Sequence, residues 1–169
     1  SDLGKSLFKE AHQKGIKIRI LTNSLASTDN LEAFSGYQRD RQKLLATGVR
    51  IFEFKPDAKE RYQMMTGALQ RKMNFKPIFG LHAKSMIIDG KTAVIGTFNL
   101  DPRSANLNTE CFVVINSEAI TAEMSRKMNI EFGSENAWET TPKFNPDHFV
   151  NLKKRILTKT RRVVPKDIL

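Results

Sequence analysis

The amino-acid sequence predicts an α/β domain in which helices flank a mixed β-sheet. The chain has 169 residues, of which 40% are hydrophobic and 27% are charged, and this is the size and composition of one globular domain. Helical and strand patterns alternate along the first half, and Asp89-Gly90, a dipeptide typical of hairpin turns, separates two apolar runs in the second half. The single cysteine, Cys111, excludes a disulfide framework, so we expect apolar packing to stabilise the core.

The first half of the chain has the rhythm of helix, strand, helix, strand. The expected elements are a helix over residues 3–11, a strand over 16–20, a helix over 31–46 and a strand over 49–54. Gly15 and Gly48 follow the two helical patterns as C-terminal stops, and Ser27, Thr28 or Asp29 is the expected N-cap of the second helix. Short connections between such elements are typical of a layered α/β domain.

The second half begins with a long connection over residues 55–80 and continues with strands. We expect strands over 81–88, 92–96 and 111–115 in one mixed sheet, loops over 97–109 and 133–143, and a helix from Ser117 to about residue 132. The apolar run after Glu110 has the pattern of a buried strand, so we expect Cys111 to be buried and unreactive. Asn145-Pro146-Asp147 combines a cap, a proline and an acid at the start of a last helix.

The net charge of +10 at pH 7 is concentrated in two stretches. Residues 151–169 hold seven basic residues and one acidic residue, and residues 61–88 hold five basic residues and no acidic one. Such stretches attract nucleic acid, anionic membranes or phosphate-bearing substrates, but a solvated basic surface has the same composition. The positive charge alone therefore does not identify what the protein binds.

No stretch approaches the roughly 18 consecutive apolar residues that a transmembrane helix needs. The sequence begins with Ser1-Asp2, without an initiator methionine or a signal-peptide pattern. We therefore expect the chain to be part of a longer protein.

His82, Lys84 and Asp89 form an H-x-K-x4-D pattern at the entry of a predicted strand. His82 and Lys84 are two residues apart, so they project to the same face. A neutral imidazole is a competent nucleophile near neutral pH, and a nearby ammonium stabilises charge that develops on phosphate oxygens, so the pair suits attack on a phosphodiester. Asp89 is more simply interpreted as a turn residue.

Thr97 and Asn99 follow the next strand and add neutral donors that face one way. Glu110 is an acceptor suited to hold the second nitrogen of a histidine and so fix its tautomer. Three widely spaced histidines, one cysteine and no acidic cluster near His82 are too few ligands for a zinc or two-metal site, so we expect neither a metal nor another cofactor.

With Gly96, these residues match H-x-K-x4-D-x6-G-[ST/G]-x-N, and the chain therefore resembles the phospholipase D superfamily. The stretches N-L-D-P-R-S over 99–104 and L-N-T-E over 107–110 look like the bacterial cardiolipin synthases, particularly their C-type members. Residues 21–29, 35–37 and 44–45 look like the opening of the second catalytic half in that branch. The resemblance covers about residues 1–132. It implies a phospholipase D-like layered domain, with a catalytic half-domain over 1–144 and a basic C-terminal helix and tail over 145–169.

The resemblance implies a two-step transfer without metal. His82 would attack phosphorus to form a phosphohistidine or would act as the acid and base, while Lys84 and Asn99 would hold phosphate oxygens. Glu110 would orient a histidine, and Asp89 would have a supporting role among the catalytic residues. The substrate-binding positions implied by the same resemblance are Thr97, Arg103, Ser104 and Tyr37.

One departure from the family pattern is serious, because family enzymes need two such motifs and this chain carries one. Neither His12 nor His148 has a lysine two residues later. The resemblance therefore implies the C-terminal half of a two-motif enzyme, whose second motif comes from a missing N-terminal half or from a homodimer partner.

Two functions compete on these grounds. The first is a phosphatidyltransferase of the cardiolipin synthase type, which acts on anionic phospholipid as a peripheral protein at the cytoplasmic face of the bacterial cell membrane. The second is a single-motif endonuclease or phosphodiesterase that acts as a homodimer, for which the positive charge is suited to DNA. The residues that flank the motif favour the lipid enzyme, and nucleic acid is the less favoured partner.

Overall fold

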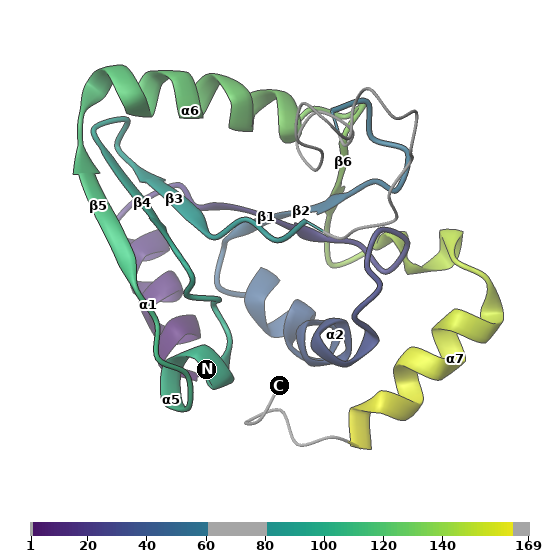
Figure 1. Ribbon diagram of the computed structural model, residues 1–169. Helices are drawn as coiled ribbons and strands as arrows, with labels where there is room; N and C mark the ends of the chain where they lie inside the picture. Colours follow the sequence, from purple (N-terminus) through teal and green to yellow (C-terminus); the bar gives the residue numbers. More distant parts are fainter. Residues whose placement is uncertain (1, 61–80, 164–169) are drawn as a thin grey trace.

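A computed structural model describes residues 2–60 and 81–163 of the chain (Figure 1). The helices in these ranges are α1 (Asp2–Gln13), α2 (Leu31–Leu45), α5 (Pro102–Asn106), α6 (Glu118–Glu131) and α7 (Leu152–Thr160), with the 3₁₀ turns η1 (Pro146–Phe149) and η2 (Arg161–Val163). The strands are β1 (Arg19–Asn23), β2 (Arg50–Phe54), β3 (Ser85–Ile88), β4 (Thr92–Gly96), β5 (Phe112–Asn116) and β6 (Ala137–Thr140). None of these helices combines the length and the apolar character needed to cross a bilayer.

The α/β class with flanking helices is confirmed, and the strands form two sheets. The first sheet has the order β1-β2-β6, in which β1 and β2 are parallel and β2 and β6 are antiparallel. The second has the order β3-β4-β5 and is antiparallel throughout. We expected β3, β4 and β5 to belong to one mixed sheet, and this prediction is wrong, because their sheet is antiparallel throughout. Parallel and antiparallel pairs occur together in the first sheet, where the helix α2 connects the parallel strands β1 and β2.

A side chain connects the two sheets. Asn23, at the end of β1, donates from Nδ2 to the carbonyl of Leu81 (2.8 Å) and accepts from the amide of Leu81 through Oδ1 (2.6 Å). The Asn23 side chain therefore pairs with Leu81 as the backbone of a neighbouring strand would, and both the amide and the carbonyl of Leu81 are hydrogen-bonded. This connection fixes the chain one residue before His82.

Most expected elements are present with shifted ends. The first strand starts at Arg19, later than predicted, and Asn30 caps α2 by accepting from the amide of Ala33, in place of the three expected cap residues. Ser117 caps α6 as predicted. The last helix is divided into two elements: the 3₁₀ turn η1 starts at Pro146, and the separate helix α7 follows its own N-cap, Asn151. The expected long connection lies mostly outside the described residues, since positions 61–80 are not among them.

Two elements appear where we expected loops. The short helix α5 lies within 97–109, where Asp101 accepts from the amide of Ser104 and Pro102 occupies the first helical position. The strand β6 lies within 133–143 and pairs with β2. A four-residue strand has too little pattern to be recognised by itself, and it forms here because β2 offers a free edge.

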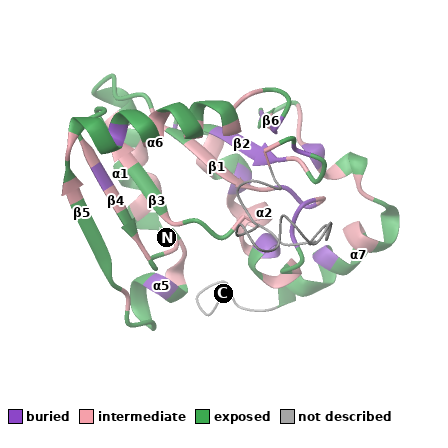
Figure 2. Ribbon diagram, turned by 45° about the horizontal axis from the view of Figure 1, so that its top comes forward, coloured by how far each residue is buried: buried purple, intermediate pink, exposed green. Residues whose placement is uncertain are grey.

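The strand β5 is exposed, contrary to the burial expected from its apolar sequence. Phe112 and Val113 are 62% and 61% exposed, and Cys111 before them is exposed as well. Figure 2 shows β5 and most of β3 as exposed, while the buried residues gather around β2. An apolar run predicts burial only where another element packs on it, and no described element covers this outer surface.

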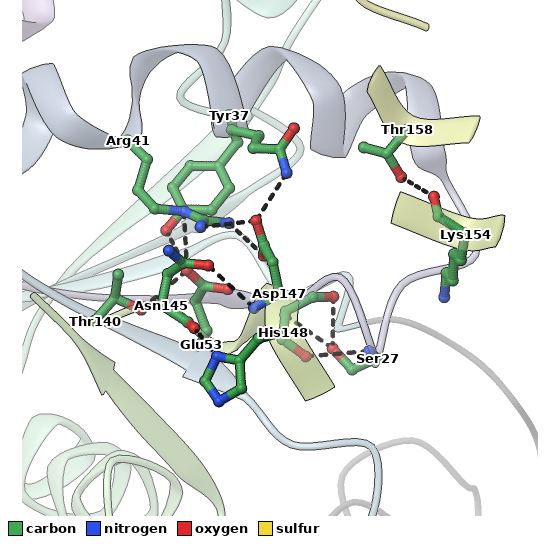
Figure 3. A network of polar contacts seen from close by, with 12 residues as sticks. Ser27, Tyr37, Arg41, Glu53, Thr140, Asn145, Asp147, His148, Lys154 and Thr158 are labelled. Carbon is green, nitrogen blue, oxygen red and sulfur yellow. Dashed lines mark hydrogen bonds and ion pairs between the residues drawn. The ribbon is translucent and has the colours of Figure 1, made fainter. Parts of the chain in front are cut away.

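A buried ion-pair network joins α2, β2 and η1 (Figure 3). The Arg41 side chain, only 5% exposed, lies 3.1 Å from Glu53 Oε1 and forms a bidentate pair with Asp147 at 3.0 and 2.9 Å. The hydroxyls of Tyr37 and Thr140 each donate to Glu53 Oε1 at 2.9 Å. Burial raises the pKa of the Glu53 carboxyl, and the Arg41 charge offsets part of this effect. The network fixes α2 and η1 to the first sheet.

We predict that Arg41→Ala lowers the free energy of unfolding by about 3–5 kcal/mol, because it leaves two carboxylates without their cation in a buried place. Chemical denaturation measures this loss. Arg126→Ala, at an exposed position of α6, is the matched control and should change stability by less than ~0.5 kcal/mol. Equal stability of the two variants would contradict a structural role for the network.

Candidate active site

The residues of the H-x-K pattern and of the following loops line one open pocket of about 740 Å³. The pocket is lined by His82, Lys84, Gly96, Thr97, Asn99, Leu107, Asn108, Thr109 and Glu110. Three segments supply them: the stretch that enters β3, the end of β4 with the turn after it, and the segment between α5 and β5. The antiparallel pairing of β3, β4 and β5 brings the three segments to the same end of the second sheet.

The close approach of β4 and β5 at this end requires a glycine. A Cβ on Gly96 would lie 2.3 Å from the Cys111 carbonyl oxygen and 2.6 Å from the Phe112 Cβ, closer than real atoms come. The amide of Gly96 donates to the carbonyl of Lys84 (3.0 Å), which extends the β3–β4 ladder toward the pocket. Gly96 thus lets Thr97 sit directly beside the entry to β5, where its amide donates to the Cys111 carbonyl (2.9 Å).

Glu110 is held by neutral donors from both sides. The Thr97 hydroxyl donates to Oε2, and the Asn108 amide donates to Oε1 at 3.0 Å. The hydrogen bond from Thr97, followed by those from Asn108 and Ser104, lowers the pKa of the Glu110 carboxyl, so the group is an anion at neutral pH. Each carboxylate oxygen keeps a further lone pair, so Glu110 can still accept from a group that enters the pocket.

Lys84 is the cation of the pocket. Burial lowers the pKa of its ammonium, and the charges of Glu110 and Asp101 act in the opposite direction. The ammonium donates to the carbonyl of His82 (3.2 Å), which keeps the two motif residues close together. A partly desolvated ammonium interacts more strongly with an anion than a fully solvated one does.

The short helix α5 holds the loop that carries Asn99. The Ser104 hydroxyl accepts from the amide of Asn99 (3.2 Å), and Ser104 itself is buried. Arg103 is exposed and donates to Asn108 (3.3 Å), so it contacts the pocket wall through a neighbour. The sequence did not single out Asn108 as a site residue, although its place two residues before Glu110 was an available signal.

Four of the nine expected site residues do not line this pocket: Arg103 and Ser104 lie beside it in α5, and Asp89 and Tyr37 lie away from it. Asp89 is in the turn between β3 and β4 with a φ of 52°, and Gly90 after it has a φ of 66°, as in the hairpin turns that Asp-Gly favours. Tyr37 lies in the buried network with Glu53. The structure therefore brings His82, Lys84 and Asn99 together with Thr97 and Glu110 and leaves Asp89 and Tyr37 elsewhere.

The arrangement offers one imidazole, one ammonium, an amide and a carboxylate around an open space. It suits binding of an oxyanion with an imidazole placed for attack, and a phosphodiester has the matching charge. In the described ranges, 2–60 and 81–163, no three His, Cys, Asp or Glu side chains lie together in a way that would hold a metal ion.

Comparison with known proteins agrees with this chemistry. The family described as "Cardiolipin synthase, PLD-like domain" matches residues 1–131. Cardiolipin synthase C of Escherichia coli is 43% identical over 127 residues, which are 75% of this chain and 26% of that protein. An uncharacterised protein of Helicobacter pylori is 32% identical over 132 residues, 78% of this chain and 24% of its own, and cardiolipin synthase A of Erwinia tasmaniensis is 33% identical over 84 residues, 50% and 13% respectively. The chain thus spans about a quarter of the length of the first two relatives.

We predict that the Lys84 ammonium loses its proton at a lower pH than an ordinary lysine does, because burial lowers its pKa. Phosphate binding that depends on the charge of Lys84 should therefore already weaken at a pH at which ordinary lysines remain charged. Glu110→Gln should lower the pKa of Lys84 further, because the variant loses a nearby negative charge. NMR titration of lysine side-chain carbons measures both effects, with Glu118→Gln on α6 as the control. An unchanged Lys84 titration in Glu110→Gln would show that the two groups are not coupled.

Proposed function

The chain belongs to the cardiolipin synthase family with a phospholipase D-like domain, and from this premise we propose that it forms one catalytic half of a phospholipid phosphatidyltransferase. The observation that carries the proposal is the pocket in which His82 and Lys84 lie with Asn99 and Glu110. The proposed substrate is an anionic phospholipid, and transfer of its phosphatidyl group to another lipid alcohol gives a product of the cardiolipin type. Transfer to water would be hydrolysis of the phospholipase D type.

The proposed first step is attack by His82 on phosphorus. The N–P bond forms while the bond from phosphorus to the leaving alcohol breaks, and that alcohol oxygen takes a proton from an acid on the opposite side. The ammonium of Lys84 and the amide of Asn99 hold the non-bridging oxygens, whose charge grows in the transition state. In the second step the acceptor alcohol gives its proton to the same opposite group and attacks phosphorus, and His82 is released.

The remaining site residues have supporting roles in this proposal. Thr97 and Asn108 hold the Glu110 carboxylate, which is then placed to accept from a histidine that enters the pocket. Ser104 supports the Asn99 loop, and Arg103 acts on the substrate side. Asp89 contributes through the turn between β3 and β4.

The proposed setting is the cytoplasmic face of a bacterial cell membrane, with the protein attached peripherally. Residues 1–144 would form the catalytic half-domain, and residues 145–169 would form the basic segment beside the lipid. The second motif would come from another segment of the same protein, in keeping with relatives of which this chain spans about a quarter.

A second candidate is a homodimeric phosphodiesterase that acts on nucleic acid. Two observations favour it: the chain carries one motif, and its net charge of +10 suits a polyanion. In that case a second copy of this chain would supply the opposite histidine by two-fold symmetry.

We predict that His82→Ala abolishes lipid transfer, with a loss of roughly 10⁴-fold or more, because the attacking group is gone. Lys84→Ala should lower turnover by roughly 10²–10³-fold, since one charge-stabilising donor is removed. The measurement is phospholipid product formation by a protein that carries this chain together with a second motif.

Lys91→Ala, at the exposed turn beside β4, is the control and should keep full activity. Thermal melting should be the same for all variants, because the exposed His82 contributes little to the core. Near-normal turnover in either motif variant would remove that residue from the mechanism.

We also predict that the 169-residue chain alone does not turn over phospholipid as a monomer. One imidazole cannot stand on both sides of phosphorus in an in-line displacement, so His82 needs a second acid or base opposite it. The test is cleavage of phospholipid and of DNA across a dilution series, with the mass measured by sedimentation. A monomer that cleaves phospholipid at every dilution would refute the two-motif mechanism, and a dimer that cuts DNA but not lipid would establish the alternative.

A further inference from the structure

A second hollow, of about 420 Å³, lies on the other side of the fold and shares no lining residue with the catalytic pocket. We name it the C-terminal basic pocket. It lies between α2, the segment that leads into η1, and the helix α7 with its continuation η2. It is lined by Gln38, Arg41, Lys143, Phe144, Asn145, Asp147, His148, Arg155, Lys159 and Arg162.

The charge of this pocket is uncompensated. Asp147 is the one acidic residue among the lining residues, and both of its oxygens are already bound: Arg41 contacts each of them, and Gln38 donates to Oδ2 (2.7 Å). Within the described part of the chain, Lys143 and Lys159 have no carboxylate within ion-pairing distance, and neither does Arg155. These side chains are available for an anion.

Most of the basic side chains of this pocket belong to α7 and η2, which are hydrogen-bonded to the rest of the fold. Arg162 donates to Gln38 Oε1 (2.8 Å), and Arg39 of α2 donates to the Arg162 carbonyl (3.2 Å). Lys154, on the inner side of α7, donates to the carbonyl of Thr28 at 2.8 Å. Because α7 and η2 are bound to the body of the protein at both ends, the basic side chains extend from a fixed backbone.

An apolar ridge runs along the same helix next to the pocket. It consists of Leu152 and Ile156 of α7 and Val163 of η2, preceded by Phe149 at the end of η1, and all four are exposed. Leu152 and Ile156 are 66% and 53% exposed. A spacing of four residues places Leu152 and Ile156 on one face of α7, and Arg155 and Lys159 follow them by three residues each, so the basic side chains lie next to the apolar ones.

We propose that the C-terminal basic pocket binds the phosphate of an anionic membrane lipid while the apolar ridge of α7 enters the lipid surface. The site is separate from the catalytic pocket, so it would hold the protein on the membrane and would not take part in the transfer at His82. An amphipathic helix with basic side chains beside an apolar face has the composition of an element that lies in the plane of a membrane interface.

The ridge distinguishes a lipid from other carriers of phosphate. A free phosphate ion and a nucleic acid backbone would be satisfied by the basic side chains alone, and large apolar side chains beside them would add nothing to binding. An anionic bilayer supplies both contacts, because its phosphates attract the cations and its acyl region accepts the apolar side chains.

The test is co-sedimentation of the purified chain with phosphatidylcholine vesicles that contain or lack phosphatidylglycerol. The double variant Arg155→Gln/Lys159→Gln should reduce partition onto the anionic vesicles by roughly thirtyfold, which corresponds to about 1 kcal/mol for each basic side chain at a lipid surface. The matched control Lys17→Gln/Arg126→Gln removes the same charge near β1 and on α6 and should leave partition nearly unchanged. Leu152→Ser/Ile156→Ser should weaken partition even in high salt, where the electrostatic attraction is screened.

Three outcomes would overturn the proposal. Equal losses in the two charge variants would mean that only net charge matters. Binding of inorganic phosphate that depends on Arg155 and Lys159, without a preference for anionic vesicles, would identify a free-phosphate site. Loss of a dimer in Leu152→Ser/Ile156→Ser, with vesicle binding intact, would show that a second copy covers the ridge. Arg155 is half-buried and the other substituted residues are exposed, so unchanged melting temperatures are expected. Activity in detergent is a separate measurement that does not depend on this site.

Discussion

The rest of the structure depends on the burial of one guanidinium. Arg41 lies between Glu53 of β2 and Asp147 of η1, and the desolvation cost of these three charges is offset only where they meet one another. Three segments far apart in the sequence must therefore come together in one arrangement. The hydroxyls of Tyr37 and Thr140 both donate to Oε1 of the buried Glu53 carboxylate, so α2 and β6 are fixed by the same group. A hydrophobic contact would tolerate sliding between these elements, but a bidentate ion pair does not.

The Arg41 network holds the first sheet and its helices together, and two further contacts position the pocket at His82 relative to that sheet. Asn23 at the end of β1 binds both backbone groups of Leu81, so the first sheet determines where the chain enters the site at His82. Gly96 lets β4 and β5 approach closely enough for Thr97 to bind Glu110. The pocket is thus positioned by contacts to the backbone of Leu81 and by the close approach of β4 and β5.

The two pockets differ in the charged side chains that line them. The pocket at His82 holds a cation and an anion together, Lys84 and Glu110, which suits chemistry on a phosphate that must enter and leave. The C-terminal basic pocket has its one acid, Asp147, already neutralised and presents unpaired cations beside an apolar ridge, which suits stable attachment. We propose a phosphate ligand for both pockets, but the histidine and lysines that line the second one do not form an H-x-K pattern.

The sequence by itself determined the elements and the motif, because both are local. Spacing of apolar residues, the Asp89-Gly90 turn and the Ser117 cap act within a few residues, so they predicted α1, α2, α6 and the β3–β4 hairpin, whereas α5 was expected to be a loop. The motif pattern likewise identified His82, Lys84, Gly96, Thr97 and Asn99 among the residues that line the pocket, although its Asp89 lies elsewhere. Tertiary structure alone decided what is buried and what pairs: the exposure of Cys111, the division into two sheets, the strand β6 and the place of Tyr37. Each of these depends on an element distant in the sequence that packs there or fails to, and no local pattern contains that information.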